Sequence, residues 1–132
     1  KIAGRFPDVS LVVDHMGLVQ PFHPPPPEDG WAALPDLLDL AQYENVSVKI
    51  SGAGTLAREP FPFADIRDPV QRITNVFGVE RCMWGTDWTR AVELLSYEDG
   101  VEAFRQGDWL SDGDREALMG GNAARIYDWS PG

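Results

Sequence analysis

The chain has 132 residues, of which 43% are hydrophobic and 24% charged, a globular composition with enough material for one modest core. Its formal net charge is −10 and its eleven Lys and Arg residues are scattered, which excludes nucleic acid as an expected partner because phosphate binding needs clustered cations. No apolar run approaches the roughly 20 residues that span a bilayer, so we expect no membrane partner.

A single cysteine, Cys82, excludes a disulfide framework and favours a reducing, intracellular setting, so we expect a cytoplasmic protein. Cys82 lies in a predicted buried strand, and we interpret it as a small apolar core side chain rather than a nucleophile. Residues 1–5 resemble the end of a preceding helix. We therefore expect residues 1–132 to be one partial domain of something longer.

The first predicted strand is the β-branched run Val9 to His15, apolar enough to be buried on both faces of a sheet. It ends on Asp14 and His15, and polar groups at the end of a buried strand indicate a catalytic rim. His15 is thus a candidate catalytic residue, with a structural histidine as the alternative. The proline-rich segment Gln20–Gly30 predicts a surface loop, in which His23 is a loop residue or part of a lid.

A helical pattern over residues 31–41, with Pro35 in its first turn, leads to a second strand over residues 46–52. Lys49 lies inside this strand, and we interpret it as a structural partner for a neighbouring carboxylate. Ser51 stands at the end of the strand, where it either contacts a ligand or forms a turn.

Capping signals predict three further helical regions. Asp68 is the expected N-cap of the first, which Gly78 ends. Ser96 and Ser111 begin the next two. Asn122 is the expected cap of a short terminal turn that places Ile126 and Tyr127 inward.

The third strand is the run Arg81–Trp88, in which Gly85 lets the chain turn and present Asp87 at the carboxyl end. A carboxylate there is costly to desolvate, so Asp87 must meet water, a cation or hydrogen-bond donors. The alternative interpretation is an N-cap of the helix that follows.

Strands that alternate with helices imply an α/β fold with parallel strands, in either a doubly wound sheet or a (β/α) barrel. No glycine-rich phosphate loop follows any strand, which counts against a nucleotide-binding sheet. In a barrel the strand ends at His15, Ser51 and Asp87 would converge on one mouth. Because a (β/α)8 TIM barrel needs eight strands and about 250 residues, the chain would supply only its last three strands, an incomplete barrel.

Four segments in a fixed order carry a resemblance to a known family: LVVDHMG (11–17), VKISG (48–52), MWGTDW (83–88) and GNAARIY (121–127). The chain resembles the C-terminal half of the amidohydrolase-related proteins, TIM-barrel members of the amidohydrolase superfamily. These include lactonases, such as the 2-pyrone-4,6-dicarboxylate hydrolases, and metal-dependent decarboxylases of aromatic or related acids. The resemblance covers nearly the whole chain but does not specify a substrate.

The resemblance implies that His15 ends the sixth barrel strand, Ser51 follows the seventh and Asp87 ends the eighth. The family residue that matches Asp87 is a metal ligand and proton-transfer group, or a general base where no metal is kept. The one that matches His15 polarises the substrate or shuttles a proton. A divalent metal such as zinc is therefore implied for metal-dependent members and none for lactonase-like ones.

Two features depart from the family. Thr89 and Arg90 stand where a proline commonly follows Trp88, and the histidines of the first and fifth barrel strands lie outside this sequence. We expect Ser51, Trp88 and Arg90 to contact substrate. Arg90 is the nearest cation for an anionic group, with a solvated arginine as the alternative.

The expected function is hydrolysis of a lactone or cyclic ester of a small organic acid, with Asp87 as base or metal ligand and His15 polarising the substrate. One rival is a metal-dependent carboxy-lyase on the same barrel. The other is an inactive fragment or interaction module whose exposed sheet edges pair with a partner or a second copy, so a homo-oligomer stays open.

Overall fold

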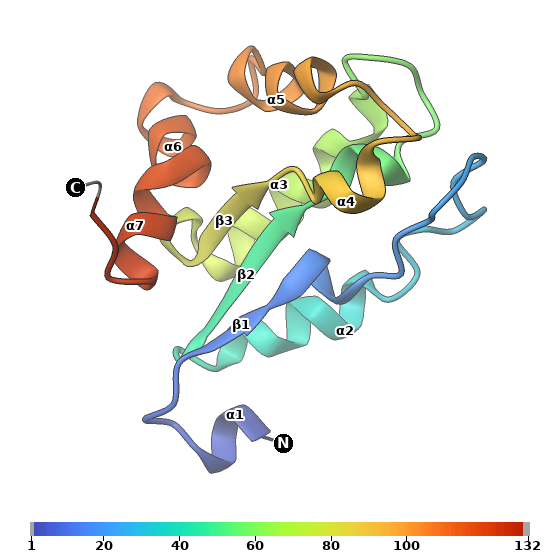
Figure 1. Cartoon of the computed structure of the whole chain (residues 1–132). Helices are drawn as coiled ribbons and strands as arrows, with labels where there is room; N and C mark the ends of the chain where they lie inside the picture. The colour runs from blue at the N-terminus through green and yellow to red at the C-terminus, as the bar shows by residue number, and fades with distance from the viewer. Residues whose placement is uncertain (1, 131–132) are drawn as a thin grey trace.

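The computed structural model describes residues 2–130, in which strands and helices alternate along the chain (Figure 1). Strands β1 (Leu11–Val13), β2 (Val46–Ser51) and β3 (Cys82–Gly85) form one parallel sheet in the order β1-β2-β3. The predicted α/β class with three parallel strands is confirmed.

Short helices and turns connect and follow the strands. The helices are α1 (Ile2–Arg5), α2 (Leu34–Asp39), α3 (Arg67–Phe77), α4 (Trp88–Ala91), α5 (Tyr97–Arg105), α6 (Asp112–Glu116) and α7 (Asn122–Ile126). None of the helices in residues 2–130 is both long enough and apolar enough to cross a membrane.

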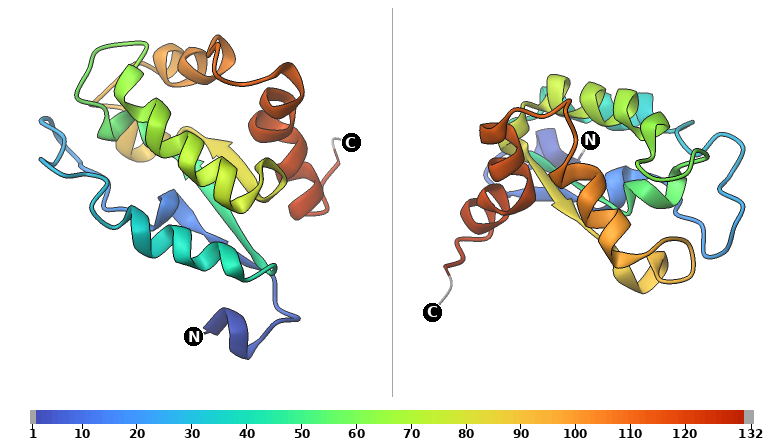
Figure 2. Two further views of the ribbon diagram at one scale, coloured as in Figure 1. Left: turned by 180° about the vertical axis from the view of Figure 1, so that it is seen from behind. Right: turned by 90° about the horizontal axis from the view of Figure 1, so that it is seen from above.

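Helices of the described chain cover one face of the sheet and leave the other without a covering helix. Helices α2 and α3 lie side by side behind the strands in Figure 1 and in front of them in the left view of Figure 2. Val46, Val48 and Ile50 of β2 are buried in the core with these helices, whereas Ser47 and Lys49 alternate onto the other face and are only half-buried.

The prediction that the first strand is buried on both faces is wrong. All three residues of β1 are half-buried. The reason is that, in the described part of the chain, helices cover only one face of the sheet and nothing pairs with the outer edge of β1. The strand also stops at Val13, two residues earlier than predicted, because Asp14 begins a 3-10 turn.

The predicted N-caps are correct at Ser96 and Ser111 and wrong at Asp68 and Asn122. The Ser96 and Ser111 hydroxyls accept hydrogen bonds from the backbone N–H groups of Asp99 and Asp114. Asp68 is not an N-cap, because a 3-10 turn runs directly into α3 and the helix has already begun at Arg67.

The end of the chain also differs from expectation. Asn122 lies inside α7, and its side-chain amide donates to the backbone oxygens of Val79 (2.7 Å) and Cys82 (2.8 Å). Asn122 therefore ties the last helix to the beginning of β3 instead of capping a turn. Tyr127, expected to point inward, is 55% exposed because it follows the last turn of α7.

Candidate active site

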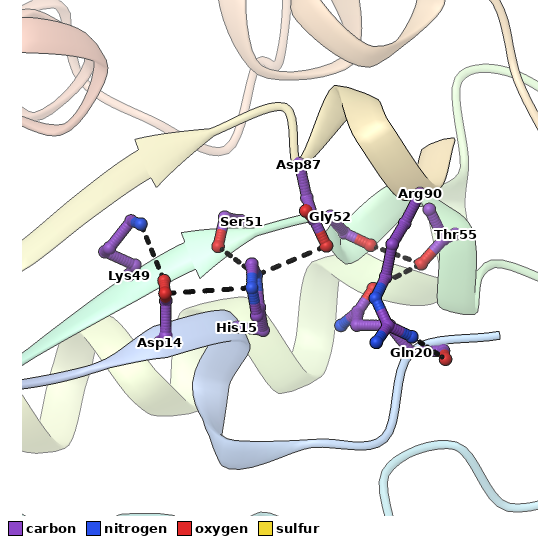
Figure 3. A network of polar contacts seen from close by, with 9 residues as sticks. All are labelled: Asp14, His15, Gln20, Lys49, Ser51, Gly52, Thr55, Asp87 and Arg90. Carbon is purple, nitrogen blue, oxygen red and sulfur yellow. Dashed lines mark hydrogen bonds and ion pairs between the residues drawn. The ribbon is translucent and has the colours of Figure 1, made fainter. Parts of the chain in front are cut away.

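The ends of the three strands bring His15, Ser51 and Asp87 together (Figure 3). His15 Nδ1 lies 2.8 Å from the Ser51 hydroxyl oxygen and 3.3 Å from Asp87 Oδ2. These contacts join residues that follow β1, end β2 and follow β3. The convergence expected from parallel strand order is therefore present in the structure.

Unusual backbone geometry places two of these side chains. His15 and Asp87 both have a φ of 50°, in the left-handed region that residues with a side chain seldom adopt. Such conformations persist only where the surroundings hold them, and they cluster at functional sites. Gly85 pairs with Ser51 in the sheet, and a Cβ at Gly85 would lie 3.2 Å from the Ser51 Cβ, so glycine leaves Ser51 its room.

The Asp87 carboxylate is buried without a hydrogen bond to its Oδ2 atom. Its side chain is 8% exposed, and no group in residues 2–130 donates to Oδ2. His15 Nδ1 is near enough for an ion pair, but its hydrogen-bond partner is Ser51. Asp87 occupies the N-cap position of α4 and its side chain makes no capping bond. The capping alternative thus explains why Asp87 stands at the beginning of α4. It does not explain why its carboxylate is buried without a hydrogen bond, and this carboxylate is available to a ligand.

His15 lies between two carboxylates. Asp14 Oδ2 is 3.7 Å from His15 Nε2, on the side of the ring away from Asp87. Lys49 Nζ lies 2.6 Å from Asp14 Oδ1, and this hydrogen bond holds the pKa of Asp14 below its ordinary value. The structural role predicted for Lys49 is confirmed. An imidazole with an acceptor near each nitrogen can hold a proton and pass it on.

Trp88 and Arg90 have protein partners. Trp88 is 37% exposed, and its ring meets the Tyr97 ring edge to face at 5.3 Å. Arg90 Nη1 donates to the Gln20 backbone oxygen at 2.9 Å, and its guanidinium lies 3.9 Å from the centre of the Phe22 ring. Arg90 therefore holds the proline-rich loop against α4. Substrate contacts by Ser51, Trp88 and Arg90 stay predictions.

Sequence reasoning missed Gln20, which it placed in a surface loop. The Gln20 side chain is buried, with 4% exposed, and contacts the buried hydroxyl of Thr55. Nothing local marks it, since proline-rich segments are ordinarily solvated. His23, in the same loop, is exposed and lies 3.1 Å from Glu93 Oε2, as befits a loop residue.

The residues present fit part of a metal centre. A carboxylate oxygen and an imidazole nitrogen are both zinc ligand types, and the unpartnered Asp87 Oδ2 would suit that role. No group of three or more His, Cys, Asp or Glu residues that could hold a metal occurs within residues 2–130. Cys82 does not contribute, because burial raises the pKa of its thiol to about 12.

Comparisons with known proteins show which family and which relatives this chain is similar to. The family model described as Amidohydrolase matches residues 1–129. An L-fucono-1,5-lactonase of Burkholderia multivorans is 35% identical over 105 residues, which are 74% of this chain and 34% of that protein.

Two solved structures share the fold at 28% identity. One is an amidohydrolase from Burkholderia multivorans with bound zinc, at a TM-score of 0.77 over 98% of this chain and 47% of that one. The other is a Pseudomonas putida protein assigned as a 2-pyrone-4,6-dicarboxylic acid hydrolase, at a TM-score of 0.63 over 92% and 44%. The chain thus spans less than half the length of the relatives it matches.

Proposed function

The chain belongs to the amidohydrolase family, and on that premise we propose that the protein hydrolyses a lactone or cyclic ester of a small organic acid. The observation that carries this proposal is the meeting of His15, at one edge of the sheet, with the buried carboxylate of Asp87, whose Oδ2 has no hydrogen bond. The similarity to an L-fucono-1,5-lactonase supports it.

In the proposed reaction Asp87 is the general base. It takes a proton from water as the water oxygen bonds to the carbonyl carbon, and the carbonyl oxygen becomes an oxyanion. His15 donates a hydrogen bond to that oxygen and stabilises its charge. The bond from carbon to the ring oxygen then breaks, and the ring oxygen takes the proton from Asp87. One water and one lactone thus give one hydroxy acid.

A divalent metal, when bound, makes water more acidic and polarises a carbonyl. Of the residues in this chain, Asp87 would bind it, with His15 beside it. Asp14 and Lys49 would keep His15 oriented from its other side. Asp87 is needed in either case, as the general base or as the metal ligand, so the Asp87 variant below tests both.

The cations nearest the site favour an uncharged lactone over a dicarboxylate. Lys49 is paired with Asp14, and Arg90 is engaged by Gln20 and Phe22. In the described part of the chain, both cations are thus already engaged by protein groups rather than offered to an anionic substrate. A hydroxylated sugar lactone therefore suits this part of the rim better than a substrate with free carboxylates.

Asp87→Asn tests the proposal in the full-length protein. General base catalysis contributes on the order of 100- to 10,000-fold, so we expect kcat for sugar-lactone opening to fall at least about 100-fold. Asp8→Asn, at an exposed position, is the matched control and should keep the wild-type rate. Unchanged hydrolysis in Asp87→Asn contradicts the proposal, and release of carbon dioxide from an aromatic acid by the wild type would favour a carboxy-lyase.

A further inference from the structure

The side chains of Gln20 and Asp87 both approach Gly52. Gly52, after the end of β2, has a φ of 69°, and a Cβ there would lie 2.7 Å from Gln20 Oε1 and 3.1 Å from the Asp87 Cβ. Gln20 therefore borders the space that a side chain at Gly52 would fill with its amide, and Asp87 borders it with its Cβ. In Figure 3 both extend toward the region below Gly52.

Each of these side chains carries a buried polar atom without a hydrogen bond, although Asp87 Oδ2 also lies 3.3 Å from His15 Nδ1. The atoms are Gln20 Nε2 and Asp87 Oδ2, and no group in the described residues hydrogen-bonds either. Buried polar groups are ordinarily satisfied, so each such atom needs an explanation. Two of them, on side chains that both border Gly52, point to a shared ligand rather than to two separate defects.

The Thr55 hydroxyl decides which Gln20 atom faces that ligand. It contacts both the Gln20 amide and the Gly52 backbone oxygen, the latter at 2.7 Å. The Gly52 oxygen can only accept, and a hydroxyl has one proton to donate. The Gln20 atom next to Thr55 must then be the NH₂ group, which is the alternative orientation of the same planar amide. That NH₂ group is then the atom 2.7 Å from a Cβ at Gly52, and the amide oxygen takes the other position, which lies on the Asp87 side of the Gln20 amide in Figure 3.

The Arg90 side chain holds the backbone of Gln20 in place. Arg90 donates to its carbonyl oxygen from α4, seventy residues away in sequence, and stacks on Phe22 two positions further along the loop. A loop anchored at its beginning can keep a side chain in place beside a reacting group.

We propose that Gln20 is a further catalytic residue, whose amide oxygen accepts one hydrogen bond from the attacking water while Asp87 accepts the other. The inference rests on the proposed hydrolysis. Two neighbouring acceptors fit a ligand that donates two hydrogen bonds, and water is the smallest that does so. With one proton held by Gln20, the other points to Asp87, which alone removes it, and a lone pair is left to attack carbon.

The test compares Gln20→Met with Gln42→Met, the same substitution at an exposed glutamine, in the full-length protein. We expect Gln20→Met to lower kcat by about 10- to 100-fold, in the range of one preorganised hydrogen bond, with KM changed less than about twofold. Because both residues act on one water, adding Gln20→Met to Asp87→Asn should cost less than about twofold more. Gln42→Met should match the wild type.

A second readout needs no activity. A high-resolution crystal structure of the wild-type protein should show an oxygen atom within about 3.2 Å of both the Gln20 amide and the Asp87 carboxylate. If no oxygen atom bridges the two groups, the inference is wrong. An unchanged kcat in Gln20→Met, or losses that multiply in the double variant, also overturn it. Absence of lactone hydrolysis in the wild type would reject the proposed function, and the bridging oxygen would then decide on Gln20 alone.

Discussion

His15 has a backbone conformation that histidine rarely adopts, with φ 50° and ψ 36°. Such a residue costs on the order of 1–3 kcal/mol and must be held by its neighbours. Met16, which follows in the same left-handed region, is fully buried and anchors the turn. The Ser51 hydroxyl then fixes the ring from the side. His15 is therefore a positioned side chain rather than a freely rotating one.

Ser51→Ala tests that positioning. The Ser51 side chain is buried against His15, so we expect its loss to lower kcat about tenfold by freeing the ring, with little change in KM. Steady-state kinetics of lactone hydrolysis by the full-length protein measures both. Ser47→Ala, on the same face of β2, is the control and should have the wild-type kcat. A raised KM with an unchanged kcat would instead mean that Ser51 binds substrate.

At the scale of elements, side chains that bind backbone oxygens hold strands and helices in place. Arg81, just before β3, donates to the backbone oxygens of Tyr43 (2.8 Å) and Ala41 (3.0 Å), which lie between α2 and β2. Asn122 does the same between α7 and β3. These bonds position the strand whose far end carries Asp87.

Asn122→Ala should destabilise the protein. The substitution leaves the backbone oxygens of Val79 and Cys82 without their donor at a position that is only 4% exposed. An unsatisfied buried polar group costs about 1–3 kcal/mol. Urea unfolding of the full-length protein should show a decrease of that size in the free energy of unfolding. Asn75→Ala, at an exposed position of α3, should change it by less than about 0.5 kcal/mol. Equal stabilities for the two variants would contradict this role.

In the whole molecule that the structure describes, the sheet has two edges without a partner strand and one face without a covering helix. In residues 2–130, β1 and β3 each pair on one side only, and the face that carries Ser47 and Lys49 has no covering helix. Unpaired strand edges and uncovered sheets pair with other chains. Relatives more than twice as long have additional chain that could complete such a sheet.

The 132-residue chain should therefore self-associate. We expect its mean mass by multi-angle light scattering to exceed 14.6 kDa and to rise with concentration. A monodisperse 132-residue monomer would show that the open edges are harmless.

Much of the fold followed from local patterns. Apolar runs, capping serines and a glycine at the end of a helix predicted the strands, their parallel order and most helix limits. Because parallel strands end at one edge, the polar residues that follow them, His15 and Asp87, could be expected to meet. The family resemblance added roles for both residues, which the experiments above test.

Only the tertiary structure decided which partners each side chain has. It turned Ser51 toward His15, left Asp87 Oδ2 without a donor and buried Gln20 beneath an arginine seventy residues away. It also left one face of β1 uncovered. The physical reason is that periodicity and capping depend on residues within a few positions of one another, whereas these contacts join segments that approach only after the sheet has formed.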